Sequence, residues 1–455
     1  MLPNLSLLRR PRTGVALLLG LTAVAGCTPG PAAAPAANPS AAAAPTPARP
    51  GELDRVAEAY VKLVLALGQH DADYVDAYYG PPAWKTEAEA AKLPLATIRA
   101  RAAELRTAVA AIPTGGLDEM QRLRRKYLDT QLRALQGRLD FLDGKRLSFD
   151  EESRVLYDAV APNHPESYYQ ELLTQLDRAL PGTGAVAERY AAWRQAFVIP
   201  RERLDTVFKT AIAACRERTM GRLQLPAGES FTVEYVNNKP WSGYNWYQGN
   251  YRSLIQVNTD LPIFVDRAID LACHEGYPGH HVYNALLEKN LVRDRGWVEF
   301  SVYPLFSPQS LIAEGSANYG IAMAFPGHER EAFERERIFP LAGIDAARAD
   351  EYYRVQGLAD RLSYAGNEAA RSYLNGQIDS TAAAAWITRY ALMEPARARQ
   401  RVRFIDKYRS YVINYNLGKD LVRQYVESRG GNDPQRRWQV FGELLSSPRL
   451  PSDLQ

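Results

Sequence analysis

The octapeptide His274-Glu-Gly-Tyr-Pro-Gly-His-His281 carries the strongest signal in this chain. It holds three of the six histidines among 455 residues, and an acidic residue directly follows the first of them. Neutral imidazoles are common ligands of zinc, and a carboxylate beside the metal can take a proton from water. The alternative is a proline-kinked core helix with hydrogen-bonded histidines. Three histidines around one acid and a Pro-Gly pair favour a metal site.

A regular helix through this stretch would not build such a site. His280 lies six residues after His274 and would be rotated by about 240° from it. His281 would be nearly in phase with His274 but about 10.5 Å further along the axis, too far for two Zn–N bonds of about 2.1 Å. Pro278 lacks an N–H group and Gly279 permits unusual dihedral angles. We therefore expect a broken helix that brings one of the two later histidines beside His274, and the spacing leaves open which one.

The sequence outside the octapeptide has mainly helical texture. Apolar residues recur at helical spacing in residues 53–69, 95–111 and 117–141, and the texture returns from about 263 to 445. Three short intervening stretches are rich in β-branched and aromatic residues, namely 231–236, 244–247 and 251–257. We expect a mainly α fold with a small antiparallel β-sheet next to the active-site helix.

The chain begins with the pattern of an export signal. Arg9, Arg10 and Arg12 precede an apolar run over residues 15–25, which is too short to span a bilayer. The run ends in Val24-Ala-Gly-Cys27, which resembles the lipobox of bacterial lipoproteins, where the cysteine thiol accepts the lipid. The alternative is an ordinary secretory signal with an incidental cysteine.

Three segments follow from this pattern. Residues 1–26 are predicted to be a lipoprotein signal peptide, and residues 27–50 the lipidated Cys27 with a tether. From Thr28 to Pro50, 17 of 23 residues are Ala or Pro, which is typical of an extended, semi-rigid linker. Residues 51–455 are predicted to form a helical domain around the candidate metal site, with a candidate sub-boundary near residue 225.

Charge and missing motifs exclude several classes of function. Residues 1–50 hold four arginines and no acidic residue, so the remainder holds 51 basic and 52 acidic side chains. A body so close to neutral lacks the basic surface of a nucleic-acid-binding protein. Three cysteines cannot form a disulfide framework, and whether Cys215 pairs with Cys273 is left open. Gly-x-Ser-x-Gly, Walker A and dinucleotide-binding glycine motifs do not occur in a strand-turn-helix context.

The motif His-Glu-x-x-Pro-Gly-His-His resembles the signature of the bacterial "domain of unknown function 885" family. That family is similar in fold to gluzincin peptidases such as carboxypeptidase Taq and thimet oligopeptidase. The resemblance implies one Zn²⁺ per chain, with His274 and His280 as ligands and Glu275 as general base. It extends over most of residues 51–430, since residues 74–81, 314–315 and 415–418 also look similar to the family, and it implies that residues 51–455 form a helical metallopeptidase-like domain.

Further site residues are expected on weaker grounds. Glu314 is the best candidate for the third zinc ligand, because it lies in an apolar helical stretch and a buried carboxylate needs a partner. Glu288 and Glu299 are alternatives in more polar surroundings. His281 is expected to be either an alternative metal ligand or a residue that supports the ligands. The phenol of Tyr415 is expected to donate a hydrogen bond to a developing oxyanion, and the alternative is that Tyr415 is a core tyrosine.

Two departures from the family pattern affect the substrate site rather than the expected ligands. The family often continues His-His-Leu-Gln, where this chain has His281-Val-Tyr283, and often has Glu-Gly-Trp-Ala, where this chain has Glu314-Gly-Ser-Ala317.

Together these features predict a zinc-dependent hydrolase of peptide bonds in the bacterial cell envelope, lipid-anchored through Cys27. Its partners would be a peptide substrate and the membrane, and no nucleic acid. Residues 251–257 could hold an extended peptide by edge pairing. The alternative is a non-catalytic peptide- or ligand-binding lipoprotein on the same scaffold.

Overall fold

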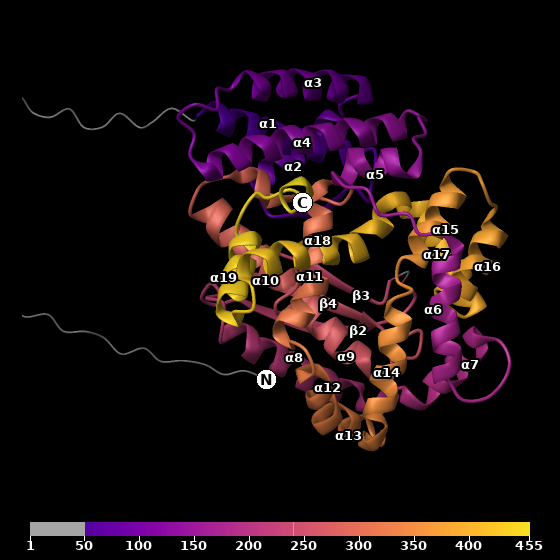
Figure 1. Ribbon diagram of the computed structural model, residues 1–455. Helices are drawn as coiled ribbons and strands as arrows, with labels where there is room; N and C mark the ends of the chain where they lie inside the picture. The colour runs from indigo at the N-terminus through magenta and orange to yellow at the C-terminus, as the bar shows by residue number, and fades with distance from the viewer. Residues whose placement is uncertain (1–50, 240) are drawn as a thin grey trace, which may run out of the picture. The chain divides into compact units, whose positions relative to one another are not determined.

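Helices make up most of the chain in the computed structural model, which describes residues 51–239 and 241–455 (Figure 1). The α-helices of the described residues are α1 (Glu52–Leu67), α2 (Pro82–Ala91), α3 (Leu95–Ala111), α4 (Glu119–Leu142), α5 (Phe149–Tyr157), α6 (Glu166–Ala179), α7 (Val186–Arg194), α8 (Leu204–Met220), α9 (Asp266–Leu271), α10 (His280–Leu287), α11 (Pro308–Ala324), α12 (Glu329–Phe333), α13 (Phe339–Ala342), α14 (Ala349–Asp360), α15 (Ala365–Leu374), α16 (Ser380–Tyr390), α17 (Pro395–Tyr408), α18 (Ile413–Gly430) and α19 (Pro434–Leu445). The strands are β1 (Val75–Tyr78), β2 (Ser230–Val236), β3 (Gly243–Tyr247), β4 (Arg252–Asn258) and β5 (Val302–Pro304).

The predicted mainly α fold is confirmed. The stretches expected to be helical at 53–69, 95–111 and 117–141 correspond to α1, α3 and α4. The start of α4 shows why the helix begins there. The side chain of Asp118 accepts a hydrogen bond from the backbone N–H of Gln121 (2.7 Å), and the Gln121 side chain accepts one from the backbone N–H of Asp118 (3.1 Å). This capping box satisfies two N–H groups that the helix leaves without partners.

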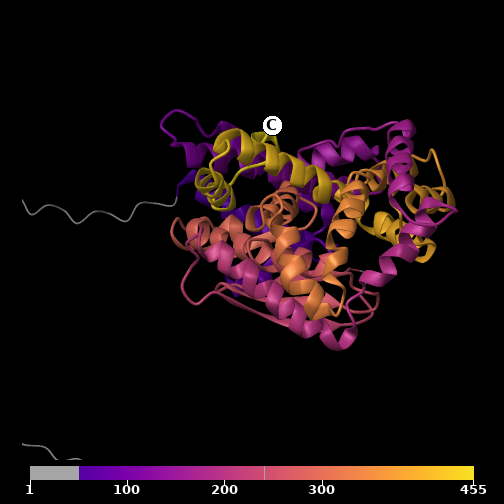
Figure 2. The same cartoon turned by 60° about the horizontal axis from the view of Figure 1, so that its bottom comes forward.

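Segments far apart in the sequence lie side by side in the domain. The magenta helices α6 and α7 lie beside the orange α16 in both views (Figures 1 and 2). Helix α11 packs along α18 near the middle of the domain, and this is the most extensive helix pair of the described residues (Figure 1). Helices from separate parts of the sequence therefore pack against one another in the domain.

The predicted small β-sheet is present, but it is mixed rather than antiparallel. Its strand order is β2-β4-β3, and β4 pairs antiparallel with β3 but parallel with β2. Strand β3 runs opposite to β2, and β4 turns back from β3 into the place between them, so β4 runs in the same direction as β2. Alternating hydrophobicity identifies strands but not their order, which is why the sequence did not reveal this pairing.

A second, two-stranded sheet joins β1 to β5 antiparallel, from segments more than two hundred residues apart. The register shifts between Val75 and Ala77, so Asp76 sits at an irregularity in β1. Such bulges turn a side chain away from the regular alternation and are frequent beside active sites. No strand was expected from the sequence at residues 75–78.

Two glycines allow α11 and α18 to touch backbone to backbone. A Cβ atom on Gly315 would lie 2.8 Å from the Cα of Gly418, and one on Gly418 would lie 2.7 Å from the carbonyl oxygen of Leu311. Ordinary van der Waals contact begins at about 3.4 Å, so no larger residue fits at either position without separating the helices. Gly315 directly follows Glu314, and Gly418 is the last residue of the stretch 415–418 that looks similar to the family.

A disulfide bond between Cys215 and Cys273 connects α8 with the octapeptide's helix (Cα–Cα 5.5 Å), which answers the pairing question left open above. The described residues from Gly51 to Gln455 form one compact unit. Among the described residues, no helix combines the length and the hydrophobicity needed to cross a bilayer. The expected signal peptide, Cys27 and the tether lie outside the described residues.

Candidate metal centre

The helix that begins with α9 breaks inside the octapeptide, as the spacing of the histidines required. After α9 the chain makes a π-helical turn over Ala272–Gly276, becomes extended at Tyr277 and starts a new helix, α10, at His280. The backbone N–H of Gly279 bonds to the carbonyl of Cys273, six residues back (2.9 Å). A Cβ atom at Gly279 would overlap the carbonyl oxygen of His274, so only glycine fits at this point of the break.

The break brings His280, and not His281, beside His274. The Nε2 atoms of His274 and His280 lie 3.1 Å apart. The Oε2 atom of Glu314, from α11, lies 3.3 Å from the first and 3.7 Å from the second. Ligands at about 2.1 Å from a tetrahedral zinc ion are about 3.4 Å from one another, so these three atoms are spaced as zinc ligands would be.

The carboxylate of Glu314 gives the best test of whether the residues fit a metal. The side chain is buried, and among the described residues its Oε2 has no hydrogen-bond donor. The other oxygen, Oε1, accepts a hydrogen bond from the phenol of Tyr411 (2.9 Å). A buried carboxylate oxygen without a donor is costly unless a cation occupies the place it faces. Oε2 faces the two imidazoles, so the donor set fits a divalent cation such as zinc.

The electrostatics of the group agree with this arrangement. Burial raises the pKa of Glu314, but the imidazoles of His274 and His280 outweigh it and hold the pKa far below its usual value. Burial lowers the pKa of His280, whereas Glu314, Glu275 and Asp76 raise it to about 9. Two imidazoles thus lie among three carboxylates, a setting that favours a positive charge.

Further side chains hold the ligands in position. The amide oxygen of Asn318 lies 3.1 Å from Nδ1 of His274, so Nδ1 donates and Nε2 keeps its lone pair for a metal. The Asn318 amide in turn donates to the backbone carbonyl of Tyr415 (3.1 Å). The sequence analysis missed Asn318, although it stands one helical turn after Glu314 and therefore on the same face of α11.

Glu275 lies beside the two histidines at the end of the π-helical turn. One carboxylate oxygen of Glu275 and the ring nitrogens of His274 and His280 all lie within 4.8 Å of one another. The backbone carbonyl of Glu275 accepts a hydrogen bond from the side chain of Asn245 in β3 (2.7 Å). The carboxylate of Glu275 can approach β3 because residue 243 is a glycine. A Cβ atom on Gly243 would lie only 2.9 Å from Oε1 of Glu275. Strand β3 therefore runs directly beside this carboxylate.

His281 points away from the group, into the sheet. It is fully buried, its Nδ1 lies 2.9 Å from the hydroxyl of Ser253, and its Nε2 lies 2.9 Å from a carboxylate oxygen of Glu229. Glu229 also accepts hydrogen bonds from the phenol of Tyr277 (2.6 Å) and from Arg216 (3.0 Å). Burial raises the pKa of Glu229, but these three donors lower it to about 2.

Asp76 is an acidic residue near the group that was not expected from the sequence. It stands on the irregularity of β1 and accepts a hydrogen bond from the phenol of Tyr244 in β3. Burial, Glu314 and Glu275 raise the pKa of Asp76, and Tyr244 and His280 lower it, with a net value of about 6. Tyr244 directly follows Gly243, which lies against Glu275, so its hydrogen bond connects Asp76 to the strand beside the candidate site.

Tyr415 lies at the edge of this group, and its ring contacts the edge of Tyr411 (5.8 Å between centroids). Burial and the charge of Glu314 raise the pKa of Tyr415 well above the usual value. The two alternative acids are engaged elsewhere. Glu288 pairs with Arg293 (2.6 Å), and Glu299 pairs with Arg124 (2.5 Å).

No family model matches this chain, and no curated protein matches it. Among solved structures, it is similar to a Colwellia psychrerythraea protein assigned as a lipoprotein, with 16% identity and a TM-score of 0.48 over 89% of this chain and 74% of that one. It is also similar to metallocarboxypeptidase 1 of Trypanosoma cruzi, with 14% identity and a TM-score of 0.40 over 86% of this chain and 90% of that one. A third is the M32 carboxypeptidase of Deinococcus radiodurans R1, with 14% identity and a TM-score of 0.36 over 89% of this chain and 93% of that one.

Proposed function

We propose that this chain is a zinc-dependent peptidase of the bacterial cell envelope. His274, His280 and Glu314 would hold the zinc ion, and Glu275 would be the general base. The observation that carries the proposal is the convergence of two Nε2 atoms on the buried Oε2 of Glu314, which has no donor among the described residues. When bound, zinc polarises a peptide carbonyl and lowers the pKa of water.

The chain's own residues would move the proton. Glu275 has a carboxylate oxygen within 4.8 Å of the ring nitrogens of His274 and His280, and as the general base it would accept a proton from the attacking water. It would then pass this proton to the leaving amine. Tyr415, at the edge of the group, would donate from its phenol to the oxygen on which negative charge develops.

Strand β3 is the proposed binding edge for an extended peptide. Residues 251–257, the edge expected from the sequence, belong mostly to β4, which is paired on both sides and offers no free edge. Among the described residues, β3 is bonded only to β4, so its other edge has no strand partner, and Gly243 and Asn245 on one face of β3 lie next to Glu275. Backbone pairing along β3 would place a peptide bond next to the base.

The test is the variant Glu275→Gln, which keeps the size of the side chain and removes the base. General-base catalysis typically contributes about 10²–10⁴-fold, so peptide hydrolysis should fall by that range while about one zinc per chain stays bound. The matched control is Glu171→Gln, at an exposed position in α6, which should cleave like the wild type. Wild-type hydrolysis by a zinc-loaded Glu275→Gln protein would refute the assignment. Tight peptide binding without cleavage by either protein would favour a binding lipoprotein.

A further inference from the structure

A disulfide bond fastens the chain one residue before the first histidine of the octapeptide. Cys273, which directly precedes His274, is bonded to Cys215 of α8, and both cysteines are fully buried. The bond is not part of the donor set of the candidate metal centre, and the proposed chemistry makes no use of it. Its place in the chain nevertheless connects it with the proposed ligands.

Both ligand histidines are attached to the backbone at Cys273. Along the chain, Cys273 is followed at once by His274. Its backbone carbonyl accepts the hydrogen bond from the N–H of Gly279 (2.9 Å), and Gly279 is followed at once by His280. A displacement of Cys273 would therefore move the backbone beside both histidines, whose Nε2 atoms now lie 3.1 Å apart.

The backbone around Cys273 is an isolated turn rather than part of a regular α-helix. Ala272–Gly276 form a single π-helical turn, and the chain becomes extended directly after it, at Tyr277. Turns of this kind are rare in proteins and occur mostly as short interruptions of α-helices. The geometry of the turn therefore depends on contacts with other parts of the chain.

Helix α8 supplies such contacts on both sides of the break. Cys215 holds the π-helical turn through the disulfide bond. The next residue, Arg216, donates to Glu229 (3.0 Å), which in turn accepts a hydrogen bond from the phenol of Tyr277 (2.6 Å). One helix is thus connected to the chain before and after the point at which the octapeptide's helix is interrupted.

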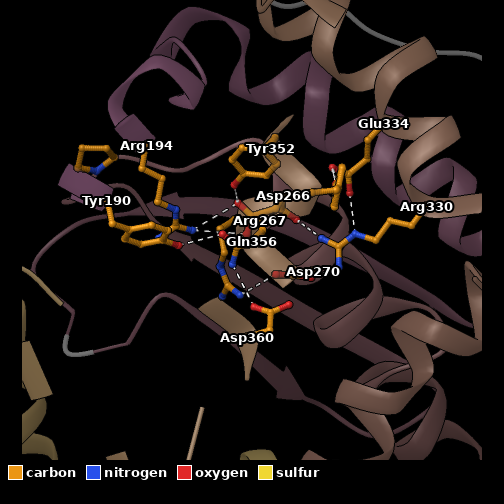
Figure 3. Close-up of polar contacts among 12 residues, drawn as sticks. Tyr190, Arg194, Asp266, Arg267, Asp270, Arg330, Glu334, Tyr352, Gln356 and Asp360 are labelled. Atoms are coloured by element: carbon orange, nitrogen blue, oxygen red, sulfur yellow. Dashed lines mark hydrogen bonds and ion pairs between the residues drawn. The ribbon is translucent and has the colours of Figure 1, made fainter. Parts of the chain in front are cut away.

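The preceding helix, α9, is held by other contacts. Asp266 accepts a hydrogen bond from the phenol of Tyr352 (2.6 Å), and Asp270 pairs with Arg330 (2.9 Å) (Figure 3). Both partners belong to other helices, α14 and α12. Because these contacts do not involve the disulfide, its loss should loosen the π-helical turn and the two histidines rather than release α9.

We propose that the Cys215–Cys273 disulfide positions His274 and His280 for zinc, so that the metal centre reaches full affinity only after this bond has formed. The inference rests on the metal site of the proposed function, but not on peptide cleavage. Bond formation takes two electrons and two protons from the two thiols, and an oxidising disulfide accepts them and becomes two thiols. Because disulfides form and persist in oxidising compartments, zinc loading would follow export from the cytosol.

The experiment uses the full chain with Cys27→Ser, which removes the third cysteine and serves as the parent protein. The oxidised parent is compared with a variant that carries Cys215→Ala and Cys273→Ala together, and with the parent refolded in a phosphine reductant. Zinc affinity is measured by competition with a chromophoric chelator, and the geometry of the ligands by the absorption spectrum of the Co²⁺-loaded protein. Neither measurement depends on catalysis.

The control for a general loss of stability is Ile98→Ala. Ile98 is fully buried in α3, so its truncation lowers the stability, but it lies neither in α8 nor in the octapeptide. All affinities are measured at a temperature at which circular dichroism shows each protein to be folded.

The double alanine variant should bind zinc about 10- to 100-fold more weakly than the oxidised parent, the range typical for loss of groups that orient a metal ligand, and its Co²⁺ spectrum should change. The reduced parent should behave in the same way, and oxidised glutathione should restore its affinity. Ile98→Ala should lower the melting temperature and leave both the zinc affinity and the Co²⁺ spectrum unchanged.

The inference is overturned if the double variant matches the oxidised parent in zinc affinity and Co²⁺ spectrum, or if Ile98→Ala weakens zinc binding as much as the double variant does. The proposed function stands in both cases, because the parent still binds zinc. If neither the double variant nor the reduced parent folds, the bond supports the whole domain and the inference is again overturned. An oxidised parent that binds no zinc removes the proposed metal site, and the inference with it.

Discussion

Replacing Gly315 by alanine should weaken both the fold and the metal centre, although alanine is normally the better helix residue. In α11 the new Cβ would lie 2.8 Å from the Cα of Gly418, against an ordinary contact distance of about 3.4 Å. The carbonyl group of Gly418 would be closer still, so helices α11 and α18 would have to separate by more than about 0.6 Å, the difference between these two distances. Forcing extra volume into a close-packed contact typically costs about 1–3 kcal/mol.

The separation would also act on the proposed ligands. Glu314 immediately precedes Gly315, and its partner Tyr411 lies just before α18, so the hydrogen bond of 2.9 Å between them joins the two helices. The bond from Asn318 to the carbonyl of Tyr415 crosses the same contact. Loss of partners behind a metal ligand commonly lowers metal affinity by about 10–100-fold, and we expect a decrease in that range.

Gly357→Ala is the matched control. Gly357 lies inside α14, and a Cβ there would meet no atom within 4 Å. The free energy of unfolding of Gly357→Ala should rise by about 0.5–1 kcal/mol, because alanine has the better helix propensity. Urea unfolding followed by circular dichroism measures the stability of both variants, and competition with a chromophoric chelator measures their zinc affinity. If Gly315→Ala is as stable as Gly357→Ala and binds zinc like the wild type, the argument from the helix contact is wrong.

Three further predictions concern single residues. His274→Ala should lose most of the bound zinc on elemental analysis, whereas His281→Ala should keep the zinc and lower the stability, because it leaves the buried Glu229 without its imidazole partner; equal zinc loss in both would contradict the ligand assignment. Tyr415→Phe should lower kcat by about 10- to 1000-fold with little change in zinc content. An unchanged kcat would indicate that Tyr415 only packs in the core. Cys27→Ser should prevent lipidation and release the protein from membranes in cell fractionation, and continued membrane partitioning would exclude Cys27 as the anchor.

The features that the sequence could predict are local ones. Helical periodicity identified α1, α3 and α4 to within a few residues, because each helix buries one apolar face and the period of that face appears in the sequence. The break in the octapeptide was also predictable, because its causes are local. Pro278 and Gly279 act on their own backbone, and the spacing of the histidines excludes an unbroken helix.

The sheet shows where local patterns stop being informative. The three strands were found, but β4 lies between β2 and β3 and pairs parallel with β2, and no pattern within a strand encodes its neighbours. The suggested peptide-binding edge was wrong as a consequence, since the stretch 251–257 is the central strand.

The composition of the candidate site divides in the same way. By itself the sequence determined that a metal site was expected at the octapeptide, that its helix must break, and that one of two adjacent histidines would join His274. The family resemblance already named His280. Only the tertiary structure showed that the break brings His280 beside His274, that Asn318 and Tyr411 contact the proposed ligands, and that Asp76 of β1 bonds to Tyr244 beside the group. The first set depends on residues within one turn of each other, whose geometry the backbone dictates. The second depends on helix and strand contacts across the domain, which follow from the packing of the whole chain.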